Sequence, residues 1–148
     1  MDNLKKLLGE LKSEDCIDRE EAAEDLGRLG DIRASDSLIA ALEDEEPYVR
    51  GAAATSLGVL KVIGAVEPLL DMLKTEYRTD VLRDIAFALG KIGDKRAIEP
   101  LRDLLRSRAK RFFKKNMTHT YFSSETEYRD FCDTAREALG KMGYKGDI

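Results

Sequence analysis

A leucine-glycine pair that recurs at almost constant spacing constrains this chain more than any other feature. The pairs begin at Leu26, Leu57 and Leu89, which are 31 and 32 residues apart, and a fourth begins at Leu139. Eight residues after each of the first three leucines stands an alanine, and sixteen residues after each stands another leucine. Anchors kept at fixed offsets predict a stacked array in which each repeat buries its apolar face on its neighbours.

Each repeat is expected to form two helices, because apolar residues follow a helical period on both sides of a short turn. In the first repeat, residues 18–44, Asp18 is expected to cap a helix over 19–29 that Gly30 ends in the left-handed conformation. A second helix is expected over 34–44. The other repeats are residues 47–74, with helices over 48–62 and 65–74, and residues 80–108, with helices over 80–92 and 97–108. The last of these helices is expected to extend to about Lys115.

Both ends of the array are expected to carry capping helices. Residues 3–12 place four leucines on one helical face and match the second helix of a repeat. Residues 124–143 predict a last helix, capped by Ser124 with Glu127 three residues later. An insert, residues 106–123, breaks the repeat spacing before this helix. We expect residues 1–148 to form a single domain.

Several of these motifs resemble a known family. The second copy contains Val49-Arg50 and Leu57-Gly58, and the third contains Ile92-Gly93-Asp94 and Arg96-Ala97. They resemble the HEAT-like repeats first noted in phycobilisome (PBS) bilin lyases. The resemblance implies an all-α fold, a right-handed α-α superhelix (an armadillo-like HEAT solenoid) of about eight helices. It implies little about function, because such families include scaffolds, lyases and nucleic-acid binders.

Composition and charge narrow the class of protein. Hydrophobic residues make up 43% of the chain and charged residues 36%, with a net charge of −4, which is typical of a water-soluble domain. No run of about 18 apolar residues is present to span a bilayer, and the first residues lack the pattern of a signal peptide. We therefore expect a cytoplasmic protein. Cys16 and Cys132 lie near opposite ends of the array and are expected to be free thiols.

The second helices of such arrays line the concave side, so their exposed residues are the first candidates for binding. Aligning the repeats places acidic residues in two columns, with a mostly apolar column between them. This combination favours a basic or amphipathic partner, because apolar burial gives affinity and charge gives selectivity. The alternative is that the apolar column belongs to the core and the acids are only solvated. The candidate partner-binding residues are Leu8, Asp36, Ile39, Glu67, Leu70, Asp71, Glu99, Arg102 and Asp103.

The insert carries the strongest local charge. Positions 106 to 115 hold six basic residues and no acidic one, and aromatic residues accompany them. Such a segment could bind phosphates or a membrane surface. We favour the alternative, in which the aromatic residues pack on the last helix and the basic residues pair with the acidic body. The basic residues of this insert are Arg108, Lys110, Arg111, Lys114 and Lys115.

The sequence offers little support for catalysis. His119 is the only histidine, so a two-histidine metal centre cannot be assembled, and we expect no metal site. Acidic residues such as Asp31 and Asp94 are expected to be caps rather than general acids or bases. Cys132 lacks the strongly basic surroundings that activate a thiolate. No glycine-rich phosphate loop is present, and we expect neither a cofactor nor catalytic residues.

These observations favour a non-catalytic protein-binding scaffold, or adaptor, that uses the concave face of its second helices. The expected partner is another protein with a basic or amphipathic segment. Neither nucleic acid nor a membrane span is expected, and the chain is expected to be a monomer or a weak dimer. Two alternatives remain open. One is a bilin-lyase-type enzyme or chromophore carrier, implied by the resemblance alone, and the other is nucleic-acid binding through the basic insert.

Overall fold

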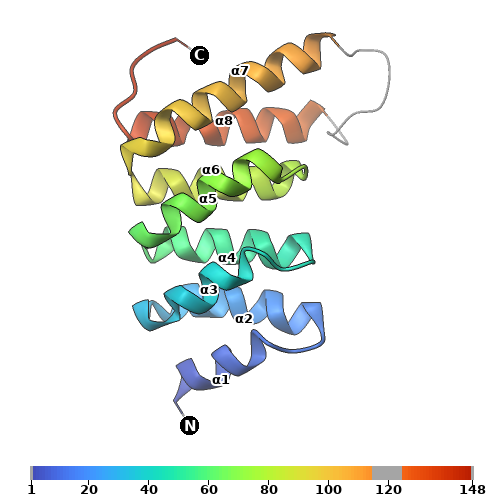
Figure 1. Ribbon diagram of the computed structural model, residues 1–148, viewed down its shortest axis with the longest axis vertical. Helices are drawn as coiled ribbons and strands as arrows, with labels where there is room; N and C mark the ends of the chain where they lie inside the picture. Colours follow the sequence, from blue (N-terminus) through green and yellow to red (C-terminus); the bar gives the residue numbers. More distant parts are fainter. Residues whose placement is uncertain (1, 115–124, 148) are drawn as a thin grey trace.

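The computed structural model describes the backbone of residues 2–114 and 125–147, and their side chains except those of 108–114 and 125. This part of the chain contains eight α-helices and no strand (Figure 1), which confirms the expected all-α fold with about eight helices. The helices are α1 (Asn3–Glu10), α2 (Cys16–Leu29), α3 (Ser35–Ala41), α4 (Pro47–Val59), α5 (Val66–Thr75), α6 (Thr79–Ile92), α7 (Ile98–Lys114) and α8 (Glu125–Lys141).

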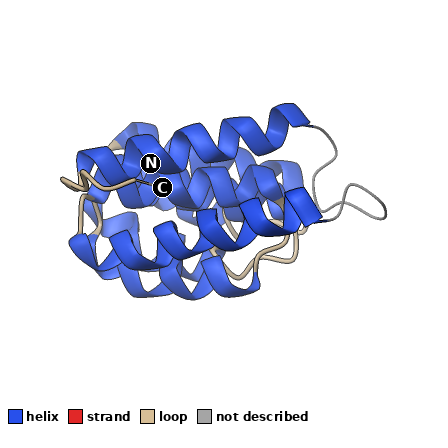
Figure 2. Ribbon diagram, turned by 90° about the horizontal axis from the view of Figure 1, so that it is seen from above, coloured by secondary structure: helices blue, strands red, loops and turns tan. Residues whose placement is uncertain are grey.

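The helices stack in two layers along the molecule (Figures 1 and 2). The first layer consists of α2, α4, α6 and α8, whose successive members pack directly against each other. The second layer consists of α1, α3, α5 and α7. Short 3₁₀ turns, Ile32–Ala34, Ile63–Ala65 and Lys95–Ala97, lead from the first layer to the second. The core of buried leucines and alanines lies between the layers and runs without a break from α1 to α8.

The recurring leucine-glycine pair is explained by packing within the first layer. Leu26, Leu57, Leu89 and Leu139 are fully buried. Each of the first three following glycines lets the next first-layer helix approach closely. A Cβ atom on Gly58 would lie 2.6 Å from the Cα of Ala88, and one on Gly90 would lie 2.8 Å from the Cα of Ala138. The leucine therefore fills the core, and the glycine sets the distance between neighbouring repeats.

The turns at the end of α2 and α6 use the same chemistry. Gly30 and Gly93 end these helices in the left-handed conformation, with φ of 73° and 76°. The aspartate that follows each glycine accepts a hydrogen bond from the backbone N–H of an arginine two residues on, at 3.0 Å for Asp31 and 2.9 Å for Asp94. The same aspartate pairs with that arginine's guanidinium group. The polar groups of each turn thus form their hydrogen bonds with neighbouring residues of the same turn.

The middle repeat lacks this motif, and Lys61 takes the place of the glycine with a φ of 52°. An L-residue with a side chain is strained in this region, whereas glycine is not. We expect Lys61→Gly to raise the free energy of unfolding by about 0.5–1 kcal/mol, since relief of strain exceeds the added flexibility of the unfolded chain. Urea denaturation followed by circular dichroism measures this change. Gly93→Ala is the matched opposite, and equal stability of both variants and wild type would contradict the strain argument.

Three expected helix ends are wrong in detail. The cap of α2 is Asp15, whose carboxylate accepts a hydrogen bond from the N–H of Ile17 at 2.8 Å, whereas Asp18 instead accepts one from the hydroxyl of Ser13. The helix α3 ends at Ala41 rather than at Asp44, because residues 42–44 make tighter bonds to carbonyls three residues back. The helix α4 likewise ends at Val59, before the turn at Lys61.

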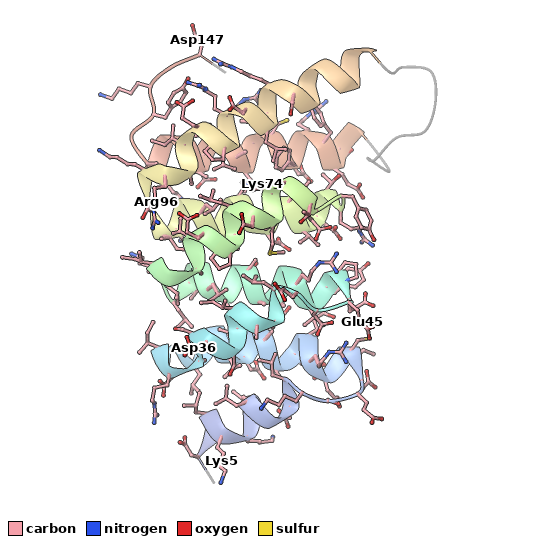
Figure 3. The ribbon with its side chains drawn as sticks, viewed as in Figure 1. Lys5, Asp36, Glu45, Lys74, Arg96 and Asp147 are labelled. Atoms are coloured by element: carbon pink, nitrogen blue, oxygen red, sulfur yellow. The ribbon has the colours of Figure 1, made fainter. Side chains whose placement is uncertain are left out.

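Two arginines, the buried Arg19 and the partly buried Arg50, join consecutive repeats at the edge of the array opposite the glycine turns. Arg19 donates two hydrogen bonds to Asp44, at 2.8 and 3.0 Å, and Arg50 donates two to Glu76, at 2.8 and 3.2 Å. Each guanidinium group also donates to two carbonyls of the loop before its helix. Figure 3 shows the two edges, with Arg96 at one and Glu45, whose carbonyl accepts from Arg50, at the other. The third repeat has Leu82 at this position, and it is buried in the core.

Within the described residues, no helix combines the length and apolarity needed to cross a membrane.

Candidate functional site

The predicted partner-binding residues lie on the second layer, where the structure separates acidic from apolar ones. The acidic residues point to solvent: Glu67 is 65% exposed, Asp71 73% and Asp103 69%, and Asp36 and Glu99 are also exposed. They come from three successive helices, α3, α5 and α7, at equivalent positions of the repeat. Figure 3 shows Asp36 and Lys74 on the side of α3 and α5 that faces the viewer. This row of side chains is accessible to a partner.

The apolar column is largely part of the core. Leu8 and Ile39 are half-buried and pack against the core, and Leu70 is only 8% exposed. Leu70 therefore stabilises the fold and offers almost no surface to a partner. Arg102, at the equivalent position of α7, is half-buried and pairs with Glu99 and Asp103. The accessible part of this surface is consequently polar, with Leu8 and Ile39 contributing only part of their side chains.

Basic side chains partly neutralise the acidic row. Glu67 accepts a hydrogen bond from Arg96 at 2.9 Å, and Asp71 accepts one from Lys74 at 3.1 Å. These pairs are exposed and screened by water, so each stabilises the fold only weakly. A partner's cation can therefore compete for the same carboxylates at little expense. We call the exposed carboxylates of α3, α5 and α7 the acidic face; they are Asp36, Glu67, Asp71, Glu99 and Asp103.

The basic insert falls mostly outside what the structure describes. The helix α7 continues to Lys114, so it is longer than α3 and α5. The side chains of Arg108, Lys110, Arg111 and Lys114 lie outside the described residues, and so does the whole of Lys115. The expectation that the insert packs on α8 therefore stays a prediction.

A groove that the sequence did not reveal crosses the first layer. It has a volume of about 510 Å³ and is lined by residues of α2, α4 and α6. Its floor is made of small residues, and its walls include Tyr48 and Val59. Four carboxylates and two guanidinium groups surround it: Glu20, Glu24, Asp80, Asp84, Arg28 and Arg83. The sequence signal was the run of small residues from Gly51 to Thr55, which also fits tight helix packing.

Asp84 is the least solvated carboxylate of this first-layer groove. Its side chain is 27% exposed, and its ion pair with Arg83 is a long contact of 3.4 Å. A Cβ atom on Gly51 would lie 2.5 Å from its Oδ2, so the glycine leaves room for the carboxylate. Burial raises the pKa of Asp84 to about 6, although Arg83 acts in the opposite direction. Burial also raises the pKa of Glu20, and Glu24 and Glu46 add to this effect.

The raised pKa of Asp84 predicts how stability depends on pH. Folding favours the protonated form of Asp84, so its contribution to the free energy of unfolding depends on pH. The stabilisation is fully present below the pKa of an aspartate in the unfolded chain, near 3.9, and is lost as the pH rises through about 6. At pH 7 we expect Asp84→Asn to stabilise the fold by about 1–2 kcal/mol, after allowance for solvent screening. Urea denaturation between pH 4 and pH 7 tests this, and an unchanged pH slope in the variant would contradict it.

The cysteines and aspartates that could in principle act in catalysis lie in surroundings that favour a structural role. Cys16 and Cys132 are free thiols, as predicted, and burial raises the pKa of Cys132, which disfavours the reactive thiolate. Hydrogen bonds from Arg33 and Arg96 lower the pKa of Asp31 and Asp94, which act as caps in their turns. Among the residues with described side chains, no cluster of three or more ligand-type residues is arranged to hold a metal ion.

Comparison with known proteins places these features in context. Residues 4–89 match the family model for HEAT repeats, and residues 81–107 match the model for the PBS lyase HEAT-like repeat. No curated protein matches. A chain in the solved complex of CpcE and CpcF of phycocyanin lyase from Nostoc sp. PCC7120 is similar, with 29% identity and a TM-score of 0.77. The alignment covers 97% of this chain and 54% of that chain, so the present chain spans about half its length. This likeness confirms the expected right-handed α-α superhelix.

Proposed function

Because this chain belongs to the HEAT-repeat family, we propose that it is a non-catalytic protein-binding scaffold that holds its partner on the acidic face of the second layer. The observation that carries the proposal is the regular placement of exposed carboxylates on α3, α5 and α7. One repeat supplies one or two of them, so a partner segment lying across the helices meets carboxylates in succession. Arrays of this type commonly use such extended surfaces for binding.

The chemistry of the face favours a basic partner segment. Exposed carboxylates accelerate association with a cationic partner and reject an acidic one, and their effect weakens as salt is added. The half-buried side chains of Leu8 and Ile39 provide limited apolar contact. We therefore expect affinity to depend strongly on ionic strength, unlike binding in an apolar groove.

Affinity capture from a lysate of the source cells tests this function. Wild type is compared with Asp71→Lys/Asp103→Lys, which reverses two exposed charges on the acidic face. The matched control is Glu21→Lys/Asp130→Lys, which makes the same change in net charge at exposed positions of α2 and α8. We expect a protein that wild type and the control retain and the acidic-face variant loses at least tenfold. Equal retention by all three folded proteins would contradict the proposal.

A second candidate function is favoured by one specific finding, the similarity to a chain of the phycocyanin lyase complex. On this alternative the chain is a lyase-type enzyme or a chromophore carrier. The first-layer groove does not favour it, because the ionised propionate groups of a tetrapyrrole bound there would meet Glu20 and Asp84, which no short ion pair with a described side chain compensates. Titration with a bilin decides the matter: a shifted, saturable absorption band would favour the lyase alternative over the scaffold, and an unchanged spectrum would disfavour it.

A further inference from the structure

The first-layer groove lies on the opposite layer from the acidic face and is not used by the function proposed above. We propose that this groove binds a lysine or arginine side chain that projects from a helix of a partner protein, with its cation placed between Glu20 and Asp84. The two carboxylates come from α2 and α6, and the small residues of α4 lie between them on the floor of the groove.

The first argument is the balance of charge. Of the two guanidinium groups at the groove, Arg28 is held by Glu24 and Asp25, at 2.9 and 2.6 Å. Asp80 is held by Arg78 at 2.8 Å. Glu20 makes no ion pair with any residue whose side chain is described, and Asp84 has a contact of 3.4 Å with Arg83. The groove therefore keeps two weakly compensated carboxylates, and a cation is the group that complements them.

The second argument is the space around Asp84. The carboxylate occupies the volume that a side chain on Gly51 would fill, and it is 27% exposed with no short ion pair. A carboxylate that is mostly removed from water and poorly paired is destabilising by itself. An ammonium or guanidinium group placed against it would restore the lost electrostatic stabilisation.

The third argument is the shape and polarity of the remaining surface. Gly27, Gly51, Ala52 and Ser56 leave a shallow floor, and Tyr48 and Val59 form apolar walls. Lysine and arginine bury their methylene groups along apolar surface and keep the charge at a polar rim. A helix from a partner presents such side chains one or two turns apart, which suits a groove that crosses three helices. An anionic or purely apolar occupant would leave the carboxylates without a counter-charge.

The experiment titrates the chain of residues 1–148 with an alanine-based helical peptide that carries three arginines at four-residue spacing, and measures affinity by calorimetry. We expect Glu20→Gln/Asp84→Asn to weaken binding at least tenfold while keeping the shape of the groove. Asp130→Asn/Asp133→Asn, at exposed positions of α8 outside both surfaces, is the control of equal charge and should leave the affinity unchanged. Asp71→Asn/Asp103→Asn, on the acidic face, tests whether the peptide binds there instead. A peptide with citrulline in place of arginine has the same shape without the charge and should not bind.

A second readout depends on Asp84 itself. Near pH 6 this carboxyl is partly protonated, so a bound cation would lower its pKa and release a proton. The other ionisable groups that line the groove are Glu20, Glu24 and Arg28 on α2, Tyr48 on α4, and Asp80 and Arg83 on α6. Calorimetry in two buffers of different ionisation enthalpy measures the release, and we expect Asp84→Asn to reduce it by at least half.

The outcomes separate this proposal from the one before it. If only the groove variant loses affinity for the arginine peptide, the groove site is supported. The acidic face is then tested separately by the capture experiment described above. Affinity lost in the acidic-face variant alone overturns the groove site while supporting the acidic face. Absence of binding to wild type at millimolar peptide, or equal binding of the citrulline peptide, also overturns the groove proposal.

Discussion

Gly58→Ala is expected to be the most disruptive single-methyl change in this protein, lowering the free energy of unfolding by about 2–3 kcal/mol. The new Cβ would lie 2.6 Å from the Cα of Ala88 and 3.0 Å from its Cβ. Because the first of these contacts is with the backbone of α6, no rotamer change relieves it, and the two helices must move apart. The greater helix propensity of alanine offsets only about 1 kcal/mol of the clash. Thermal and urea denaturation measure the loss.

Gly140→Ala is the matched control, because Gly140 is the equivalent glycine of the last leucine-glycine pair. No described atom lies within 4 Å of a Cβ placed there. We expect this variant to be as stable as wild type or more stable by up to about 1 kcal/mol, since alanine favours the helix. If Gly58→Ala and Gly140→Ala changed stability equally, the glycine would matter for its backbone and not for the distance between repeats.

Glu76→Ala is expected to lower the free energy of unfolding by about 3 kcal/mol, because it leaves the partly buried Arg50 without its carboxylate. Glu76 is 4% exposed in its side chain and accepts two hydrogen bonds from Arg50. It also accepts the backbone N–H groups of Tyr77 and Arg78 at 3.0 Å, so it holds the loop that leads into α6. One side chain therefore joins the second and third repeats. Urea denaturation measures the loss.

Asp71→Ala provides the comparison for an exposed ion pair. Asp71 pairs with Lys74, and both side chains are more than 70% exposed, at 73% and 75%. Its removal is expected to change stability by no more than about 0.5 kcal/mol. A small effect of Glu76→Ala, similar to that of Asp71→Ala, would show that the buried pair contributes no more than a surface pair does.

The described helices follow the repeat pattern closely because that pattern is local. Leucines and alanines at helical spacing, with Gly30 and Gly93 after them, determine where a first-layer helix lies and where it ends. The cap of α2 was predicted wrongly because two residues could fill the same role. Asp15 and Asp18 both suit a helix cap, and only the path of the loop from Ser13 decides that Asp15 takes it.

The candidate sites were less predictable, because exposure depends on neighbours from other repeats. The sequence placed Ile39 and Leu70 in one column, yet the first is half-buried and the second is core. The ion pair of Arg50 with Glu76 joins residues 26 positions apart. The sequence contained one indication of this pair, because Arg19 and Asp44 are separated by almost the same number of residues, 25.

By itself the sequence determined the period, the class of fold and most of the residues that face the core, because each follows from spacing along a single helix or turn. Tertiary structure alone decided that Asp84 lies over Gly51, that Glu20 comes to the same groove, and that no described residue packs against Gly140 as Ala88 packs against Gly58. Those facts depend on the distance and angle between successive helices. That geometry is set jointly by every contact in the stack, and no local pattern encodes it.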